Sequence, residues 1–200
     1  VMINKPIWSL PTELSHNVCG STDTLSFVGG VGDFDTKGII RNPGDIIAQI
    51  PGTIENIGFA LSQENCTLAD AVRLKVFYTP NEICDEITLI NALQDILPMD
   101  PSPVISTLPV PLQPFQGQEV QIQAIAARGW RKRGDFQFAS QPLEVPGDEP
   151  SRRPLVTTSL RAGEFIAVSN RTAAHFNKKL EMSLDGPGQS HIIMPSLQNS

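Results

Sequence analysis

The chain has 200 residues, of which 40% are hydrophobic and 18% are charged, and this composition is typical of a globular protein with a substantial core. A net charge of -6 argues against electrostatic binding of nucleic acid, which requires a basic surface. No apolar run approaches the ~18 residues of a membrane-spanning helix, and the first residues lack the apolar segment of a signal peptide. We therefore expect a cytoplasmic protein that contacts no membrane.

The cysteines and the basic residues indicate neither a metal site nor a phosphate site. Cys19, Cys66 and Cys84 form an odd set without CxxC spacing, so the sequence predicts no disulfide framework and no zinc site. A basic cluster at 128–133 has no aromatic residues or repeated basic stripe that would bind nucleic acid, and we interpret it as a solvated turn. No cofactor motif is present.

The first half of the chain alternates between strand and helix patterns. Residues 24–28 predict a strand that ends at Gly29 and Gly30. Apolar residues then recur at helical spacing between Ile46 and Leu61, and Pro51 lies within this stripe. Because proline lacks the backbone donor, we expect the regular helix to begin near Pro51 or to kink there.

The next elements complete the pattern of one sheet. Residues 72–78 alternate as in a strand with one buried face, and residues 83–97 return to helical spacing until a group of prolines ends the helix. Two more strands are predicted at 104–110 and 119–127. The order β, α, β, α, β, β favours an α+β fold in which two helices pack on one face of a single mixed sheet.

The remainder contains a linker and a weak internal repeat. We interpret 130–153 as a linker with a short strand, because it is charged and rich in Gly and Pro. Residues 160–176 can be aligned with residues 20–35, since both stretches have a turn, a short apolar strand and small residues after it. Chance similarity between two short strands is the alternative.

Four segments in order carry a family resemblance: GDIIAQIPGTIENIGFALSQ, CTLADAVRLKVFYT, LINALQDIL and EVQIQAIAARG. Together they resemble the RidA (formerly YjgF) family of enamine and imine deaminases. The resemblance implies the RidA-like, chorismate-mutase-like fold over 1–129, with the linker at 130–153 and the opening strands of a second unit at 154–200. It also implies a trimer-like assembly of units, with clefts between them for small carboxylated imines or enamines.

The residues that this family uses for chemistry are partly replaced here. In the family a carboxylate-binding arginine stands in a context like P-A-R-S, and the matching stretch places Ile105 there, followed by Ser106 and Thr107. An isoleucine cannot donate the paired hydrogen bonds of a guanidinium, so we expect no activity on simple 2-imino acids. The glutamate of I-E-I-E-A-I-A becomes Gln123, which lacks useful basicity.

Other positions complete the site that the resemblance implies. Asn17 stands where relatives often have a tyrosine, and Asn91 matches an asparagine that the family commonly places at the cleft. We expect Gln123, Ser106 and Asn91 to converge as catalytic residues. Substrate-binding positions would then be Asn17, Ile105, Thr107 and Gln121. The alternatives are a helix-surface amide for Asn91, a solvated sheet face for both glutamines and ordinary strand hydroxyls for Ser106 and Thr107.

The resulting hypothesis is a hydrolase or deaminase that acts on an imine, an enamide or a ring C–N bond, using polar side chains and water without a metal. A catalytically silent structural or ligand-binding subunit is the alternative, because both the arginine and the glutamate are replaced. Fold analogy is the basis of this hypothesis. A cleft that stays polar would favour the enzyme, and a cleft filled by apolar side chains would favour the silent subunit.

The C-terminal part predicts a partner. After the strand GEFIAVS, the remaining residues contain no helical stripe comparable to that of the first unit. Two strands cannot bury their apolar face alone, so Leu155, Phe165, Ile166 and Val168 would be exposed unless something covers them. We therefore expect a second polypeptide chain to complete this unit in a trimeric or pseudo-trimeric assembly.

Overall fold

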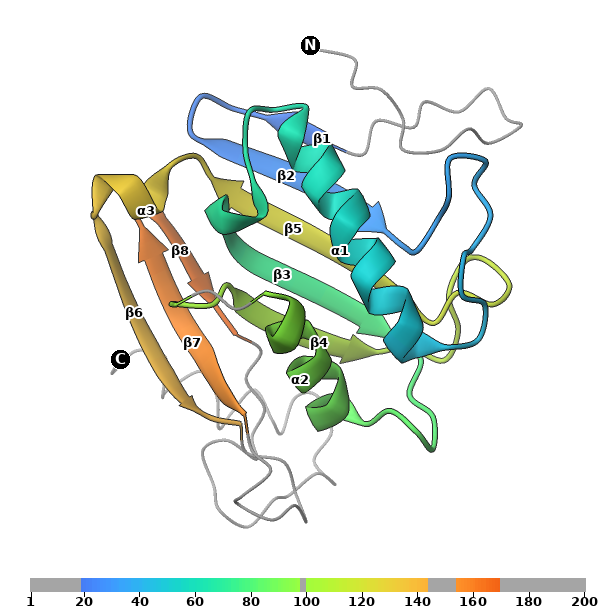
Figure 1. Ribbon diagram of the computed structural model, residues 1–200. Coiled ribbons are helices and arrows are strands. Elements are labelled where there is room, and N and C mark those ends of the chain that lie inside the picture. The colour runs from blue at the N-terminus through green and yellow to red at the C-terminus, as the bar shows by residue number, and fades with distance from the viewer. Residues whose placement is uncertain (1–18, 98–99, 144–153, 170–200) are drawn as a thin grey trace, which may run out of the picture.

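The computed structural model describes residues 19–97, 100–143 and 154–169. Its main sheet has five strands in the order β1-β2-β5-β3-β4, and only the β3–β4 pair is parallel. The strands are β1 (Cys19–Ser21), β2 (Leu25–Val31), β3 (Ala71–Tyr78), β4 (Val104–Pro109) and β5 (Val120–Ala127). Helices α1 (Ile46–Ser62) and α2 (Glu86–Ile96) cover one face, as Figure 1 shows. The predicted α+β mixed sheet with two helices on one face is confirmed.

Helix α1 begins earlier than the sequence predicts. It starts at Ile46 and continues through Pro51, because the Asp45 side chain caps it by accepting a hydrogen bond from the Ala48 backbone N–H at 3.0 Å. Pro51 is exposed. An N-cap in front of Ile46 therefore determines the start of the helix, and not the missing donor of Pro51.

Helix α2 begins later than the apolar pattern indicates. Asp85 caps it through the Thr88 backbone N–H at 2.8 Å, so Ile83 lies before the helix and is 83% exposed. A short 3₁₀ helix, η1 (Leu68–Asp70), leads from the end of α1 toward β3. None of the helices in the described part of the chain is long and apolar enough to cross a membrane.

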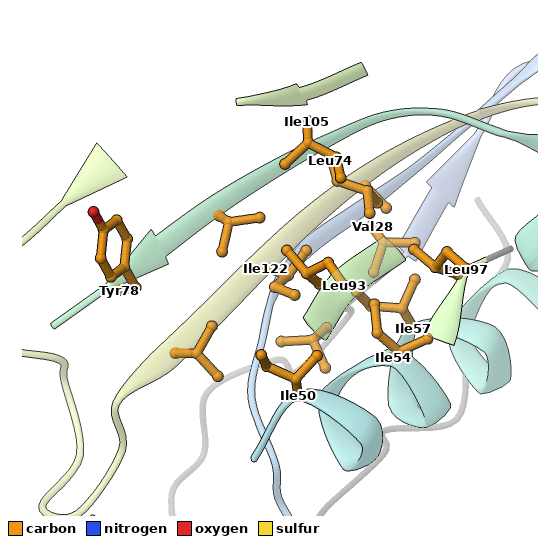
Figure 2. Packing of buried hydrophobic residues seen from close by; sticks show 14 of the residues in the cluster. Val28, Ile50, Ile54, Ile57, Leu74, Tyr78, Leu93, Leu97, Ile105 and Ile122 are labelled. Atoms are coloured by element: carbon orange, nitrogen blue, oxygen red, sulfur yellow. The ribbon is translucent and has the colours of Figure 1, made fainter. Parts of the chain in front are cut away.

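The main core lies between the sheet and the two helices. Leu74, Val76 and Tyr78 of β3 face the helices, together with Ile122 and Ala124 of β5. Figure 2 shows Leu74 and Ile122 on the side of the helix residues Ile50, Ile54, Ile57 and Leu93, with Ile105 next to Leu74. The predicted alternation of β3 is therefore confirmed. Val72 is the exception, since a register shift between Ala71 and Arg73 turns it toward a second cluster.

Strand β2 does not end at its glycines. It runs through Gly29 and Gly30 to Val31, with an irregular register between Val28 and Val31. A side chain at Gly30 would lie 2.5 Å from Nε2 of Gln121 on β5, so glycine permits close approach there. The two glycines therefore belong to the strand.

Residues 130–142 form structure where we predicted part of a linker. They contain helix α3 (Trp130–Arg133) and strand β6 (Phe136–Pro142), and β6 pairs antiparallel with β7 (Leu155–Ala162). Strand β7 in turn pairs with β8 (Phe165–Val168). The result is a second, three-stranded sheet in the order β6-β7-β8, at the left of Figure 1. The described residues thus form two sheets and not one.

The second sheet packs on the main sheet through a small apolar cluster. Leu160, Ala162 and Ala167 of the second sheet are buried with Val72, Val104, Ala127 and Trp130. Side chains also link the two parts, since Gln94 Nε2 donates to the Leu155 carbonyl at 2.6 Å and the hydroxyls of Ser102 and Thr157 lie 3.0 Å apart. The second sheet therefore covers part of the main-sheet face that the helices leave free.

Candidate functional site

The candidate site lies on the face of the main sheet opposite α1 and α2, which we call the helix-free face. On β3 this face carries Arg73, Lys75 and Phe77, because their neighbours Leu74, Val76 and Tyr78 point into the helix-side core. The register partners on β5 are Ile125 for Arg73, Gln123 for Lys75 and Gln121 for Phe77. Cross-strand partners share a face, so cationic and amide side chains meet here.

An open hollow of about 430 Å³ lies on this face. It spans β2, β5 and β3, and its lining residues are Phe27, Val28, Gly29, Arg73, Lys75, Gln123, Ala124 and Ile125. Gly29 adds no side chain, which leaves space above β2. The hollow adjoins the contact between the two sheets. Ile125 lines the hollow and also packs against the small apolar cluster between the sheets.

The hollow is positively charged. Arg73 and Lys75 contribute two cations, and none of the lining residues is acidic. Nε of Arg73 is buried and has no hydrogen-bond partner among the described residues, and Nζ of Lys75 lies 5.0 Å from the centre of the Phe77 ring. Neither cation is paired with a carboxylate in the described part of the chain. The site can therefore accept an anionic group.

The two glutamines of β5 have different surroundings. Gln123 lines the hollow, opposite Lys75. Gln121 shares the face but packs over Gly30 and does not line the hollow. Gln123 thus gives the open hollow an exposed polar side chain, and its catalytic role remains a prediction. Its amide can orient water or a ligand, since it offers both a donor and an acceptor.

Ser106 also lies on the helix-free face, but outside the hollow. It is the register partner of Lys75 on β4, it is 1% exposed, and its hydroxyl has no hydrogen-bond partner among the described residues. Strand β7 lies close to β4 and covers this part of the face. A catalytic role for Ser106 remains a prediction.

Ile105 and Thr107 face the helices, which corrects their predicted position in the cleft. Ile105 is 9% exposed and belongs to the main core, where Figure 2 shows it beside Leu74. The Thr107 hydroxyl hydrogen-bonds to the Glu86 carboxylate of α2. Successive strand residues alternate between faces, so the cleft side of β4 carries Val104, Ser106 and Leu108 instead.

Asn91 does not join the other candidates within this chain. It is exposed on α2, whereas Gln123 lies on the opposite side of the sheet. The expected convergence of Asn91, Ser106 and Gln123 on one cleft therefore does not occur within one chain. Asn17 lies outside the described residues.

Solved structures from several bacteria share this fold. RidA from an Antarctic Psychrobacter species is 19% identical over 62% of this chain and 97% of its own length, with a TM-score of 0.51. The Escherichia coli protein TdcF with bound serine is 19% identical over 64% and 98%, with a TM-score of 0.52. The Rid-family protein YyfA of Yersinia pestis is 21% identical over 64% and 98%, also with a TM-score of 0.52.

The fold is that of the RidA family. Identities of this size establish the fold and leave the reaction open. No protein-family model and no curated protein sequence matches the chain. The RidA-like fold predicted from the four sequence segments is thus confirmed by structure.

Arg73 and Lys75 are the residues that sequence reasoning missed. In the sequence they were the polar half of an alternating strand, which usually faces solvent. The signal was present, because two cations at positions i and i+2 must share one face. They become candidate site residues only when β5 places Gln123 beside them.

Proposed function

We propose that this chain binds a small molecule in the hollow and hydrolyses a C–N bond, in an imine, an enamide or a ring. The observation that carries the proposal is the polar lining of the hollow by Arg73, Lys75 and Gln123 on a RidA-type sheet. In a purely structural subunit, apolar side chains would be expected to fill this space. The serine bound to TdcF, which shares the fold, supports a small polar ligand.

In this reaction the oxygen of a water molecule bonds to the imine carbon, one proton of that water moves to the nitrogen, and the C=N double bond becomes the single bond of a carbinolamine. The hydroxyl proton of the carbinolamine then moves to the nitrogen as the C–N bond breaks, which releases ammonia and leaves a carbonyl group. The carbonyl oxygen of the Gln123 amide would hold the attacking water by accepting a hydrogen bond from it. Arg73 and Lys75 would orient the substrate through its anionic group, so that the water meets the carbon in a productive geometry.

Ammonia release from a panel of small imines, together with product formation from enamides and cyclic compounds whose C–N cleavage frees no ammonia, tests this function. We expect release above the spontaneous rate, and a loss of about tenfold or more in Gln123→Leu, which keeps the size of the side chain but cannot bind water. Cleavage at the spontaneous rate with every compound would refute the hydrolase. The matched control is Gln141→Leu, on the exposed strand β6.

A silent ligand-binding subunit is the second candidate. It is favoured by one specific observation, since none of the residues that line the hollow is a carboxylate or an imidazole able to act as a general base. Ligand binding without turnover would identify this function.

We also propose a cellular compartment and a partner chain for this protein. Buried free thiols at Cys66 and Cys84 support a reducing, cytoplasmic compartment. Leu155 and Ile166 are 62% and 64% exposed, which supports a second polypeptide that covers the β7–β8 hairpin and completes a further RidA-like unit in a trimer-like assembly. Native mass spectrometry tests this, and a homo-oligomer with the hairpin uncovered would contradict it.

A further inference from the structure

We propose that the hollow selects a small dicarboxylate, with one carboxylate at Arg73 and the second at Lys75. This inference deepens the proposed function, because it names the substrate class of the same site. It replaces the carboxylate anchor that is lost at Ile105 with two cations from the neighbouring strand β3.

The charge of the hollow is the first argument. Arg73 and Lys75 point to the same face from alternate positions of one strand, and the lining residues contain no acidic side chain. Two like charges held this close repel each other, and a buried guanidinium N–H without an acceptor is unfavourable. A single carboxylate would compensate one cation and leave the other, whereas a dianion compensates both.

The spacing of the two cations is the second argument. Alternate residues of a strand lie roughly 6.6 Å apart along it, so the two side chains present two separate points of attachment. Phosphate sites usually rely on backbone N–H groups at a helix N-terminus or in a turn. Here the backbone groups of β3 are engaged in ladders with β4 and β5, so only side chains are available. Two separated carboxylates fit this arrangement better than one phosphate.

The remaining lining suits the carbon skeleton between the carboxylates. Phe27 and Ile125 provide apolar contact on the β2 side, and Gly29 leaves room above the strand. Gln123 lies directly opposite Lys75, so its amide would contact the atoms next to the second carboxylate. The reacting C–N bond of a substrate would therefore lie close to one of its carboxylates.

Titration calorimetry on the full chain tests this selection without requiring turnover. The probes are succinate as the dicarboxylate, acetate as the monocarboxylate and inorganic phosphate. We expect succinate to bind at least about tenfold more tightly than acetate or phosphate, because it makes a second charge-assisted contact. Arg73→Gln and Lys75→Gln should each weaken succinate binding about tenfold or more, and Arg73→Lys should retain an intermediate affinity.

Lys132→Gln is the matched control, because it removes one positive charge from an exposed position of α3 that is not in the hollow. Circular dichroism confirms that each variant is folded. The inference is overturned if succinate binds no more tightly than acetate or phosphate, or if the Arg73 and Lys75 variants bind it like Lys132→Gln. Succinate binding without ammonia release would refute only the hydrolase, and ammonia release from uncharged imines alone would refute only the dicarboxylate selection.

Discussion

Lys75 on β3 and Gln123 on β5 are cross-strand partners, and both line the hollow on the helix-free face. This pairing predicts the effect of Gln123→Glu, which places a carboxylate opposite the ammonium group. The new pair should stabilise the fold by about 0.2–1 kcal/mol and should lower succinate affinity, because the added carboxylate neutralises one of the two positive charges of the hollow. Urea denaturation and calorimetry measure the two effects.

Gln141→Glu is the control for that prediction, since Gln141 lies on β6 opposite the apolar Val156. It should change neither the stability nor the affinity measurably. An unchanged succinate affinity in Gln123→Glu would contradict the side-chain arrangement described for the hollow.

Ile105→Arg should strongly destabilise the fold and not restore the family's carboxylate anchor. Ile105 is 9% exposed and packs in the main core, so an arginine there would bury an unpaired charge. We expect a loss of about 3 kcal/mol or more in the free energy of unfolding. Leu108→Arg, on the helix-free side of the same strand and 41% exposed, should stay within about 0.5 kcal/mol of the parent. Equal stability of the two variants would show that the faces of β4 are assigned wrongly.

The fold could be predicted from the sequence because its signals are local and periodic. Apolar residues recur at regular spacing in α1, β3 and β5. This spacing predicts which side of each element is buried. The first residue of each helix is not predicted correctly, because an N-capping side chain determines it and the apolar pattern does not. Asp45 starts α1 ahead of Pro51, and Asp85 delays α2 beyond Ile83.

The candidate site could be predicted only in part, because it depends on strand register. The sequence motif places Ile105 at the position of the family's arginine. A shift of one residue exchanges the two faces of a strand, so the motif alone does not determine which face Ile105 occupies. Gln123 could be predicted as a candidate because it lies in a long family motif, EVQIQAIAARG. Arg73 and Lys75 became candidates only when pairing placed them beside it.

The cysteines should react slowly in the folded protein. Burial raises the pKa of Cys19 and of Cys84 to about 11, so at pH 8 only about one thiol in a thousand is ionised. The neutral thiol is favoured by folding. The stability that the neutral thiols contribute to the fold is therefore fully present below pH 9.0, the ordinary thiol pKa. It is lost as the pH rises through their pKa of about 11 in the folded protein.

Alkylation at pH 8, with and without urea, measures this protection. Lys132→Cys provides an exposed reference thiol in the same chain, and it should react at the rate of an ordinary free cysteine. Labelling of Cys19 and Cys84 at that same rate in native buffer would contradict their burial.

Gly52→Ala should be strongly destabilising. A methyl group at this position would lie 1.9 Å from Oδ1 of Asp33, which is fully buried and 3.2 Å from Nε of Arg41. The clash would displace the carboxylate from that pair, and we expect a loss of about 2–4 kcal/mol in the free energy of unfolding. Gly20→Ala on β1 is the matched control, because no atom lies within 4 Å of its added carbon. Similar melting temperatures for the two variants would rule out the contact between Gly52 and Asp33.

Trp130 should be the main residue that holds the second sheet against the first. It is fully buried, its Nε1 donates to the Asp70 carbonyl at 3.2 Å, and its ring meets that of Phe136 edge-on at 4.9 Å. Trp130→Ala would leave a cavity between β3 and β7 and remove the hydrogen bond, so we expect a loss of about 3–5 kcal/mol in urea denaturation followed by circular dichroism. Phe138→Ala, an aromatic residue of β6 that is 47% exposed, should cost less than about 1 kcal/mol. Equal losses of unfolding free energy in Trp130→Ala and Phe138→Ala would show that the second sheet does not depend on this contact.

Ile125 connects this cluster to the hollow. Trp130→Ala should therefore also weaken succinate binding in the fraction that remains folded, whereas Phe138→Ala should not.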